Sequence, residues 1–173
     1  EVANWYNLRA TQGHADGAAG GDANAGSTQA QVLSLASRPF LSRAVEMIHR
    51  RVDLSPWMRP YCPFCGGDPE LGAINASGER RLVCGRCAGQ WPFDDVACPF
   101  CDSRDRGRIT SFEFGCWPDA SRDGLYRLTG CDVCHRYLKS YVAQGSSRPV
   151  MLDVDTIGSL LLDAAAAQRG YTG

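Results

Sequence analysis

Eight of the nine cysteines in this sequence form four identical C-x-x-C pairs. The pairs are Cys62 and Cys65, Cys84 and Cys87, Cys98 and Cys101, and Cys131 and Cys134. Two cysteines at this spacing can direct both sulfurs at one metal ion, and two pairs complete a tetrahedral site with sulfur-to-metal distances of about 2.3 Å. The pattern therefore predicts two four-cysteine metal sites that account for all eight residues.

The residues around the pairs favour tight turns. The first pair lies in C-P-F-C-G and the third in C-P-F-C. Pro63 and Pro99 preset one backbone dihedral, and Gly66 accepts the left-handed conformation that follows a second ligand. Because a short loop costs less entropy to close than a long one, neighbouring pairs should share an ion. We therefore expect the first pair to join the second and the third to join the fourth.

The cysteine region is predicted to consist of short strands and turns. The expected strands are residues 71–76, 81–83, 109–114, 126–129 and 137–143. Ser77-Gly78 and the turn-rich stretch 117–124 separate successive strands, so each half repeats one plan of cysteine pair, hairpin and cysteine pair. Because such small modules have little apolar volume, we expect bound metal to supply much of their stability.

A helix is predicted on each side of these modules. The first covers about residues 38–52, with Ser37 as a candidate N-cap and a flexible Gly- and Ala-rich stretch before it. The second begins near Asp155 or Thr156 and ends at Gly170. One apolar face of this second helix is expected to contain Ile157, Leu160, Leu161 and Ala164.

The predicted fold class is therefore small α+β, with two tandem four-cysteine modules flanked by N-terminal and C-terminal helices. The expected division is a flexible segment and helix in 1–55, a first module in 56–97, a second module in 98–145 and a C-terminal helix in 146–173.

Composition excludes several classes of protein. The 173 residues are 44% hydrophobic and 21% charged, which is typical of soluble globular proteins. The sequence shows no apolar run near the roughly 20 residues that span a bilayer, so we expect no membrane insertion. No leader peptide is visible, although the chain opens at Glu1 without Met. A net charge of −1 disfavours a large electrostatic interface with nucleic acid.

Arginine supplies nearly all of the positive charge. Two divalent ions on eight thiolates would move the net charge to about −5. Seven arginines lie near the cysteine pairs: Arg80, Arg81, Arg86, Arg104, Arg106, Arg108 and Arg136. They could neutralise the thiolate clusters, bind an acidic surface of a partner, or form an ordinary solvated face.

Other chemistries have weaker support. Cys131 to His135 reads C-x-x-C-H, the attachment motif of c-type haem, but the fourth pair needs both cysteines. His135 is therefore expected beside a site or at the surface. A disulfide framework would leave Cys116 unpaired; we expect Cys116 to be a turn residue, with a reactive thiol as the alternative.

No catalytic constellation is present in the sequence. Serine hydrolase, phosphate-loop and H-E-x-x-H signatures are absent, and His14 and His49 have no ligand partner at useful spacing. The adjacent Asp94 and Asp95 are expected to point apart. A four-cysteine site also leaves no position for a reacting water. We therefore expect no catalytic residues and no enzymatic activity.

The cysteine pairs and their flanks together resemble the FdhE family of formate dehydrogenase accessory proteins. The resemblance covers about residues 52–171. It rests on C-P-F-C-G at 62–66 with Pro69, Arg81-Leu82 before the second pair, Trp91, C-P-F-C at 98–101, and Tyr137 and Lys139 after the fourth pair. The C-terminal D-x-x-x-S-L-x-L-D at 155–163 and Gly170-Tyr171 add to it.

This resemblance implies a cytoplasmic protein with two rubredoxin-like modules, each holding one iron ion on four cysteines. It also implies a role in the maturation of formate dehydrogenase through contact with its catalytic subunit. Zinc is the alternative metal, because four thiolates suit both ions. The alternative functions are a rubredoxin-like electron carrier and a zinc-ribbon adaptor for nucleic acid or protein, the latter disfavoured by the lack of a basic stripe.

Overall fold

The computed structural model describes residues 23–115, 125–143 and 148–173. The chain divides into two compact units, residues 1–33 and residues 34–173. Within the first unit, the described residues 23–33 form the start of helix α1 (Ala23–His49). The second unit contains the rest of α1 and every other element described below.

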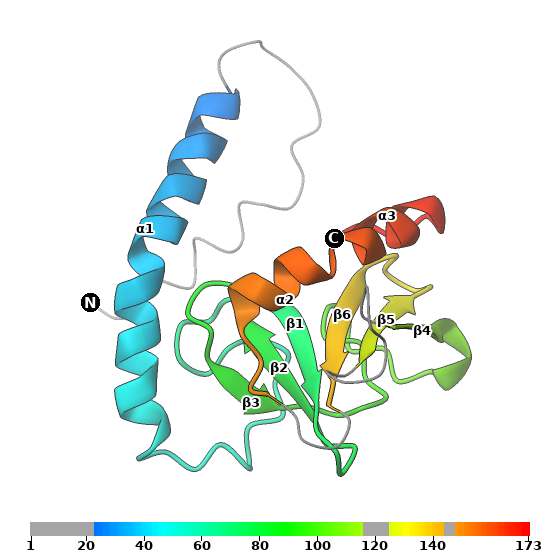
Figure 1. The fold of residues 1–173 in the computed structure, drawn as a ribbon, viewed down its shortest axis with the longest axis horizontal. Coiled ribbons are helices and arrows are strands. Elements are labelled where there is room, and N and C mark those ends of the chain that lie inside the picture. The colour runs from blue at the N-terminus through cyan, green and yellow to red at the C-terminus, as the bar shows by residue number, and fades with distance from the viewer. Residues whose placement is uncertain (1–22, 116–124, 144–147) are drawn as a thin grey trace. The chain divides into compact units, whose positions relative to one another are not determined.

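The centre of the second unit is one six-stranded β-sheet (Figure 1). Its strands are β1 (Pro69–Ile74), β2 (Arg80–Cys84), β3 (Gln90–Pro92), β4 (Ile109–Gly115), β5 (Leu125–Cys131) and β6 (Tyr137–Val142). The spatial order is β3-β2-β1-β6-β5-β4. All neighbouring strands are antiparallel except the central pair β1 and β6, which is parallel.

The central pair joins the two cysteine modules. Each predicted hairpin is present, and β3 is a short strand that the sequence did not indicate. Leu71 of β1 pairs with Lys139 of β6, so the sheets of both modules continue into one another. The predicted boundary between residues 97 and 98 stays a prediction, while the sheet that crosses between the modules is continuous.

Alternating side chains divide the apolar residues between the two faces of the sheet, because successive residues of a strand point to opposite sides. Leu82 and Leu138 lie on one face in a cluster with Val45 of α1 and Trp91. The neighbouring Val83 packs on the other face with Leu71 and Leu152. That second face also carries a cluster of Tyr126, Leu128, Tyr141, Leu162, Ala166 and Tyr171.

The C-terminal segment forms two helices rather than one. Helix α2 covers Leu152–Gly158 and α3 covers Leu160–Gln168, with Ser159 between them. Leu152, Leu162 and Ala166 face the sheet. The predicted apolar face is wrong, because Ile157 and Leu161 are 68% and 78% exposed.

The reason for this error is that polar residues occupy the buried stripe of the segment. Asp155 and Ser159 are 0% and 1% exposed, and hydrogen bonds satisfy both side chains. The predicted cap at Asp155 is therefore a buried anchor inside α2. Hydrophobic periodicity alone cannot identify a buried stripe that includes hydrogen-bonded polar groups.

Helix α1 also differs from the prediction. It begins at Ala23, well before the expected cap at Ser37, and Pro39 lies inside it. The Ala, Gln and Leu residues that precede Ser37 have high helix propensity and extend the helix backwards. Ser37 donates a hydrogen bond to the carbonyl of Ser34 instead of capping a first turn. None of the helices in the described part of the chain is long and apolar enough to cross a membrane.

Candidate metal centres

All four C-x-x-C pairs adopt the same backbone turn. The carbonyl of the first cysteine accepts a hydrogen bond from the N–H four residues later, as from Gly66 to Cys62 and from His135 to Cys131. The donor residue always has a positive φ; the four are Gly66 at 68°, Ala88 at 55°, Asp102 at 57° and His135 at 55°. The left-handed residue expected from the sequence at Gly66 is therefore a feature of every pair.

The first centre consists of Cys62, Cys65, Cys84 and Cys87, which β1 and β2 bring together at one end of their hairpin. The Sγ atoms of Cys62 and Cys87 lie 3.5 Å apart, and those of Cys65 and Cys84 lie 3.4 Å apart. Three of the four cysteines are buried, and the centre adjoins the apolar cluster that contains Trp91 and Phe93.

The second centre consists of Cys98, Cys101, Cys131 and Cys134. The Sγ atoms of Cys98 and Cys134 are 3.7 Å apart, and the same distance separates those of Cys101 and Cys131. Strand β5 ends at Cys131, and the turn before β6 supplies Cys134. Cys98 and Cys101 lie in the loop before β4. Cys101 is exposed, so this centre lies nearer to solvent than the first.

Both clusters fit a tetrahedral metal ion. Four sulfurs at about 2.3 Å from an ion are separated from one another by about 3.8 Å. The four Sγ–Sγ distances given above are 3.4–3.7 Å, and the four sulfurs of each centre all lie within 4.8 Å of one another. The eight predicted ligands thus form the two predicted groups of four, and the identity of the metal stays a prediction.

Backbone N–H groups point at the ligand sulfurs. Phe64 donates to Cys62 Sγ and Arg86 donates to Cys84 Sγ, each at 3.4 Å. In the second centre, burial raises the pKa of the Cys131 thiol, but N–H groups of Cys134 and Val133 outweigh it and the net pKa is lowered. The turns therefore stabilise thiolates, the form that binds metal.

The thiols of the first centre are too close together to ionise independently. Hydrogen bonding with Cys62 lowers the pKa of Cys65, and the same contact raises the pKa of Cys62. Four sulfurs that share protons in this way can be satisfied together by one cation, which releases the protons on binding.

The other described residues that the sequence analysis named form turn, ion-pair or ring contacts. His135 closes the fourth turn through its backbone, and its carbonyl accepts a hydrogen bond from Thr172 N at 2.7 Å. Asp94 forms a 2.8 Å ion pair with Arg104. His49 contacts the ring of Phe64. Cys116 and His14 lie outside the described residues.

Sequence reasoning missed a buried polar network beneath α2. Asp155 accepts hydrogen bonds from Tyr126 Oη at 2.6 Å, from the Met151 N–H at 2.8 Å and from Arg148 at 2.5 Å. Burial raises the pKa of Asp155, but these hydrogen bonds, above all the one from Arg148, outweigh it and leave the pKa lowered. Tyr126 is 29 residues from Asp155 in the sequence, and Arg148 lies before helix α2 rather than in it. No helix or strand pattern in the sequence therefore indicated that these side chains meet.

Comparisons with known proteins agree with this architecture. No protein-family model matches the chain. An FdhE homolog from Pseudomonas aeruginosa is 28% identical over 162 residues, which cover 84% of this chain and 50% of the relative. An FdhE homolog from Stutzerimonas stutzeri is 29% identical over 77% of this chain and 45% of its own length. FdhE from Escherichia coli O1:K1 is 30% identical over 65% of this chain and 35% of its own length.

A solved structure also matches this chain. The crystal structure of the FdhE protein from Pseudomonas aeruginosa matches with a TM-score of 0.57 and 29% sequence identity, over 66% of this chain and 39% of that one. The fold and its two clusters define a small α+β protein with two four-cysteine clusters, each of which could bind a metal ion. The sequence matches at 28–30% identity and the structural match support an FdhE family protein. It spans about half the length, or less, of the curated relatives it matches.

Proposed function

We propose that this chain is the cysteine-containing part of a formate dehydrogenase accessory protein, which binds the catalytic subunit of that enzyme during maturation and catalyses no reaction itself. The observation that carries the proposal is the pair of four-cysteine centres on one continuous sheet in a chain of the FdhE family. The proposed place of action is the cytoplasm, where free thiols stay reduced and available to metal.

The donor sets support a structural use of the metal. Each centre offers four sulfurs to one ion and so fills the tetrahedral positions that a reacting water would need. Several cysteines also belong to the apolar cluster that packs around Trp91. Bound metal would therefore fix the turns that precede the central strands β1 and β6 and shape the surface that a partner meets.

The C-terminal helices provide a surface suited to binding another protein. Five large apolar side chains of this segment are exposed: Met151, Val154, Ile157, Leu160 and Leu161. Exposed apolar patches of this kind commonly mark protein interfaces. We place the contact with the catalytic subunit on this surface.

Pull-down from anaerobic cells that express formate dehydrogenase tests the proposal. The wild-type chain should carry two metal ions and retain the catalytic subunit, and Leu161→Glu should lose the subunit while keeping both ions. Phe40→Glu is the matched control, because Phe40 of α1 is also 78% exposed. A metal-loaded wild-type chain that retains no formate dehydrogenase would contradict the proposed function.

A rubredoxin-like electron carrier is the second candidate, and the exposure of Cys101 favours it. An iron ion on four cysteines can cycle between the ferrous and ferric states, which zinc cannot do. Anaerobically purified chain from iron-replete cells should then contain iron and turn red on mild oxidation. A zinc-filled, colourless chain that still supports formate dehydrogenase activity would exclude this candidate and leave the binding function intact.

A further inference from the structure

Arg80 connects the two cysteine modules from inside the fold. It lies at the start of β2, the strand that ends at Cys84 of the first centre, and it is only 6% exposed. Its Nη1 donates to the carbonyl groups of Asp94, Asp95 and Ala97 at 3.2, 3.4 and 3.2 Å. Those residues directly precede Cys98, so a residue of the first module holds the segment that leads into the second centre.

The other terminal nitrogen of Arg80 has no such partner. Among the buried side-chain nitrogen and oxygen atoms in the described part of the chain, a single atom has no hydrogen-bond partner. That atom is Arg80 Nη2. An unpaired donor on a buried cation is expensive, because it loses hydration and gains nothing in return. We therefore expect Nη2 to have a hydrogen-bond acceptor or a negative charge beside it in the functional form of the protein.

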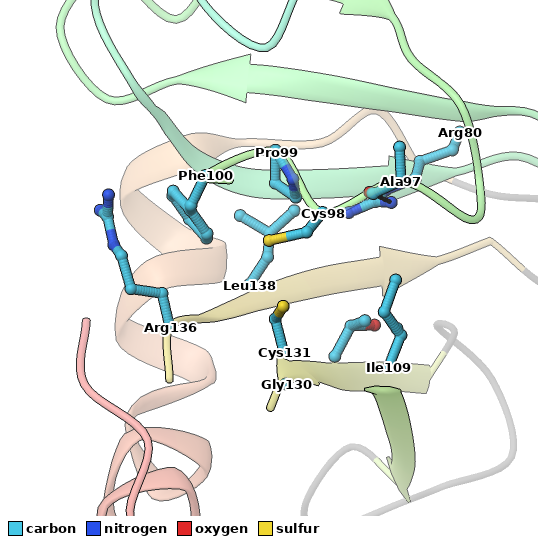
Figure 2. A pocket seen from close by; sticks show the side chains of 11 residues that line it. Arg80, Ala97, Cys98, Pro99, Phe100, Ile109, Gly130, Cys131, Arg136 and Leu138 are labelled. Carbon is cyan, nitrogen blue, oxygen red and sulfur yellow. Dashed lines mark hydrogen bonds between the residues drawn. The ribbon is translucent and has the colours of Figure 1, made fainter. Parts of the chain in front are cut away.

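The surroundings of Arg80 point to the second centre as that counterpart. Arg80 lines a pocket together with Cys98, Cys131 and Arg136, and Figure 2 shows its guanidinium group extending toward Cys98. The pocket has a volume of about 10 Å³, which is just enough for one water molecule. Its other walls are mainly apolar, with contributions from Pro99, Phe100, Ile109 and Leu138.

Charge complements this geometry. A divalent ion on four thiolates carries a net charge of about −2. In apolar surroundings, a buried cation interacts with such a charge more strongly than an arginine at the surface does. Burial lowers the pKa of Arg80, while the negative charges of Asp95 and Cys98 oppose that effect. None of the four cysteines of the first centre lines this pocket.

We propose that Arg80 is the internal counter-charge of the second centre, with Nη2 facing its thiolates directly or through one water molecule. Arg80 thereby stabilises the metal-loaded state of the second centre and not that of the first. It acts as a positioning and charge-compensating residue rather than a ligand. The inference rests on the metal-binding part of the proposed function and is independent of the partner.

Site-resolved metal release tests the role of Arg80. The zinc-loaded full chain is mixed with excess chelator and iodoacetamide, and mass spectrometry follows the alkylation of each cysteine with time. In Arg80→Gln, we expect the cysteines of the second centre to be alkylated about tenfold faster or more, because the buried charge pair is broken. The cysteines of the first centre should react at the wild-type rate and so report that the fold is intact.

Two further variants separate charge from shape. Arg80→Lys keeps the positive charge and should protect the second centre more than Arg80→Gln does. Arg81→Gln removes the neighbouring exposed arginine of β2 and should behave like the wild type.

Three results would overturn the inference: an unchanged second centre in Arg80→Gln, equal acceleration at both centres, or Arg80→Lys releasing metal as fast as Arg80→Gln. A chain that binds no zinc would overturn it together with the metal-site prediction. Normal zinc release with no retained formate dehydrogenase would instead remove only the proposed partner.

Discussion

The first centre packs against Trp91 and Phe93 in an apolar cluster, whereas the second keeps Cys101 exposed and lies beside Arg80 and Arg136. Arg136 also stacks over the ring of Phe100, with its guanidinium carbon 3.8 Å from the ring centroid. Both centres are built from the same turn with the same left-handed closing residue. The same four ligands thus have different surroundings in the two centres. We therefore expect the first centre to contribute more to folding stability and the second to exchange its metal faster.

The strongest way to break this comparison is to remove one ligand from each centre. Cys84 is 0% exposed inside the apolar cluster, and Cys84→Ser should abolish the folded state, since structural zinc sites contribute on the order of 10 kcal/mol. Cys101→Ser should keep the near-UV circular dichroism of the first centre and its Trp91 while losing one metal ion. Equal loss of dichroism in both variants would show that the two centres contribute equally to the fold.

The buried network under α2 should affect the second centre more than the first. Asp155→Ala leaves Arg148 and Tyr126 without their partner and should lower the free energy of unfolding by about 3 kcal/mol. Tyr171 follows α3 and donates to Asp132 beside Cys131, so loosening the helices should speed metal exchange at the second centre. Alkylation of the individual cysteines during zinc release, followed by mass spectrometry, measures this at each centre separately. Faster exchange at the first centre instead would contradict the coupling.

The same network predicts an acid limit for the docking of the C-terminal helices. Because the folded-state pKa of Asp155 lies below its ordinary value of 3.8, its contribution to stability is present above that pH. It is lost as the pH falls below 3.8 and through the folded-state pKa. Far-UV circular dichroism and protease sensitivity of the C-terminal segment, measured down to pH 2, follow the transition. Asp155→Asn should lack this step.

Gly130 offers a smaller and more local test at the second centre. A Cβ atom at this position would lie 2.4–2.7 Å from the ring of Tyr171, which packs directly over the strand. Gly130→Ala should displace that ring and destabilise the chain by about 1–3 kcal/mol. Thermal unfolding measures the loss, and the Tyr171→Ala background, where the clash is absent, should reduce it.

A surface charge should have the smallest effect of all. Arg104 pairs with Asp94 at 2.8 Å, but its side chain is 59% exposed. Arg104→Ala should change stability by less than about 0.5 kcal/mol and leave metal release at the second centre unchanged. An effect as large as that of Arg80→Gln would show that burial does not distinguish the two arginines.

The candidate site could be predicted from the sequence because its information is local. Each C-x-x-C sets its own turn, and the short loops between neighbouring pairs determined which pairs share a cluster. The hairpins could be predicted for the same reason, because short turn sequences mark them. One example is the turn at Gly78, whose φ is 85°. The left-handed Ala88, Asp102 and His135 were not foreseen, because these residue types do not mark that conformation as glycine does.

The arrangement of the modules could not be predicted in the same way. The parallel pairing of β1 with β6 depends on which sheet edges meet, and no local pattern specifies it. The buried stripe of the C-terminal segment includes the polar residues Asp155 and Ser159. Hydrophobic periodicity therefore predicted as buried a face that is exposed. Arg80 was one of seven arginines near the cysteines, and only its burial and its free Nη2 distinguish it from the rest.

The parallel β1–β6 pair also has a consequence for the order of folding. Every other strand pair joins strands that are consecutive in the sequence. Leu71 of β1, in contrast, pairs with Lys139 in the last strand of the other module. Contacts between distant segments form slowly, because the entropy of closing a long loop precedes any gain from the contact. We therefore expect each hairpin to close first and the central pair to form last. Until it does, β1 and β6 are unpaired sheet edges, and a newly made chain is most exposed to aggregation during that interval.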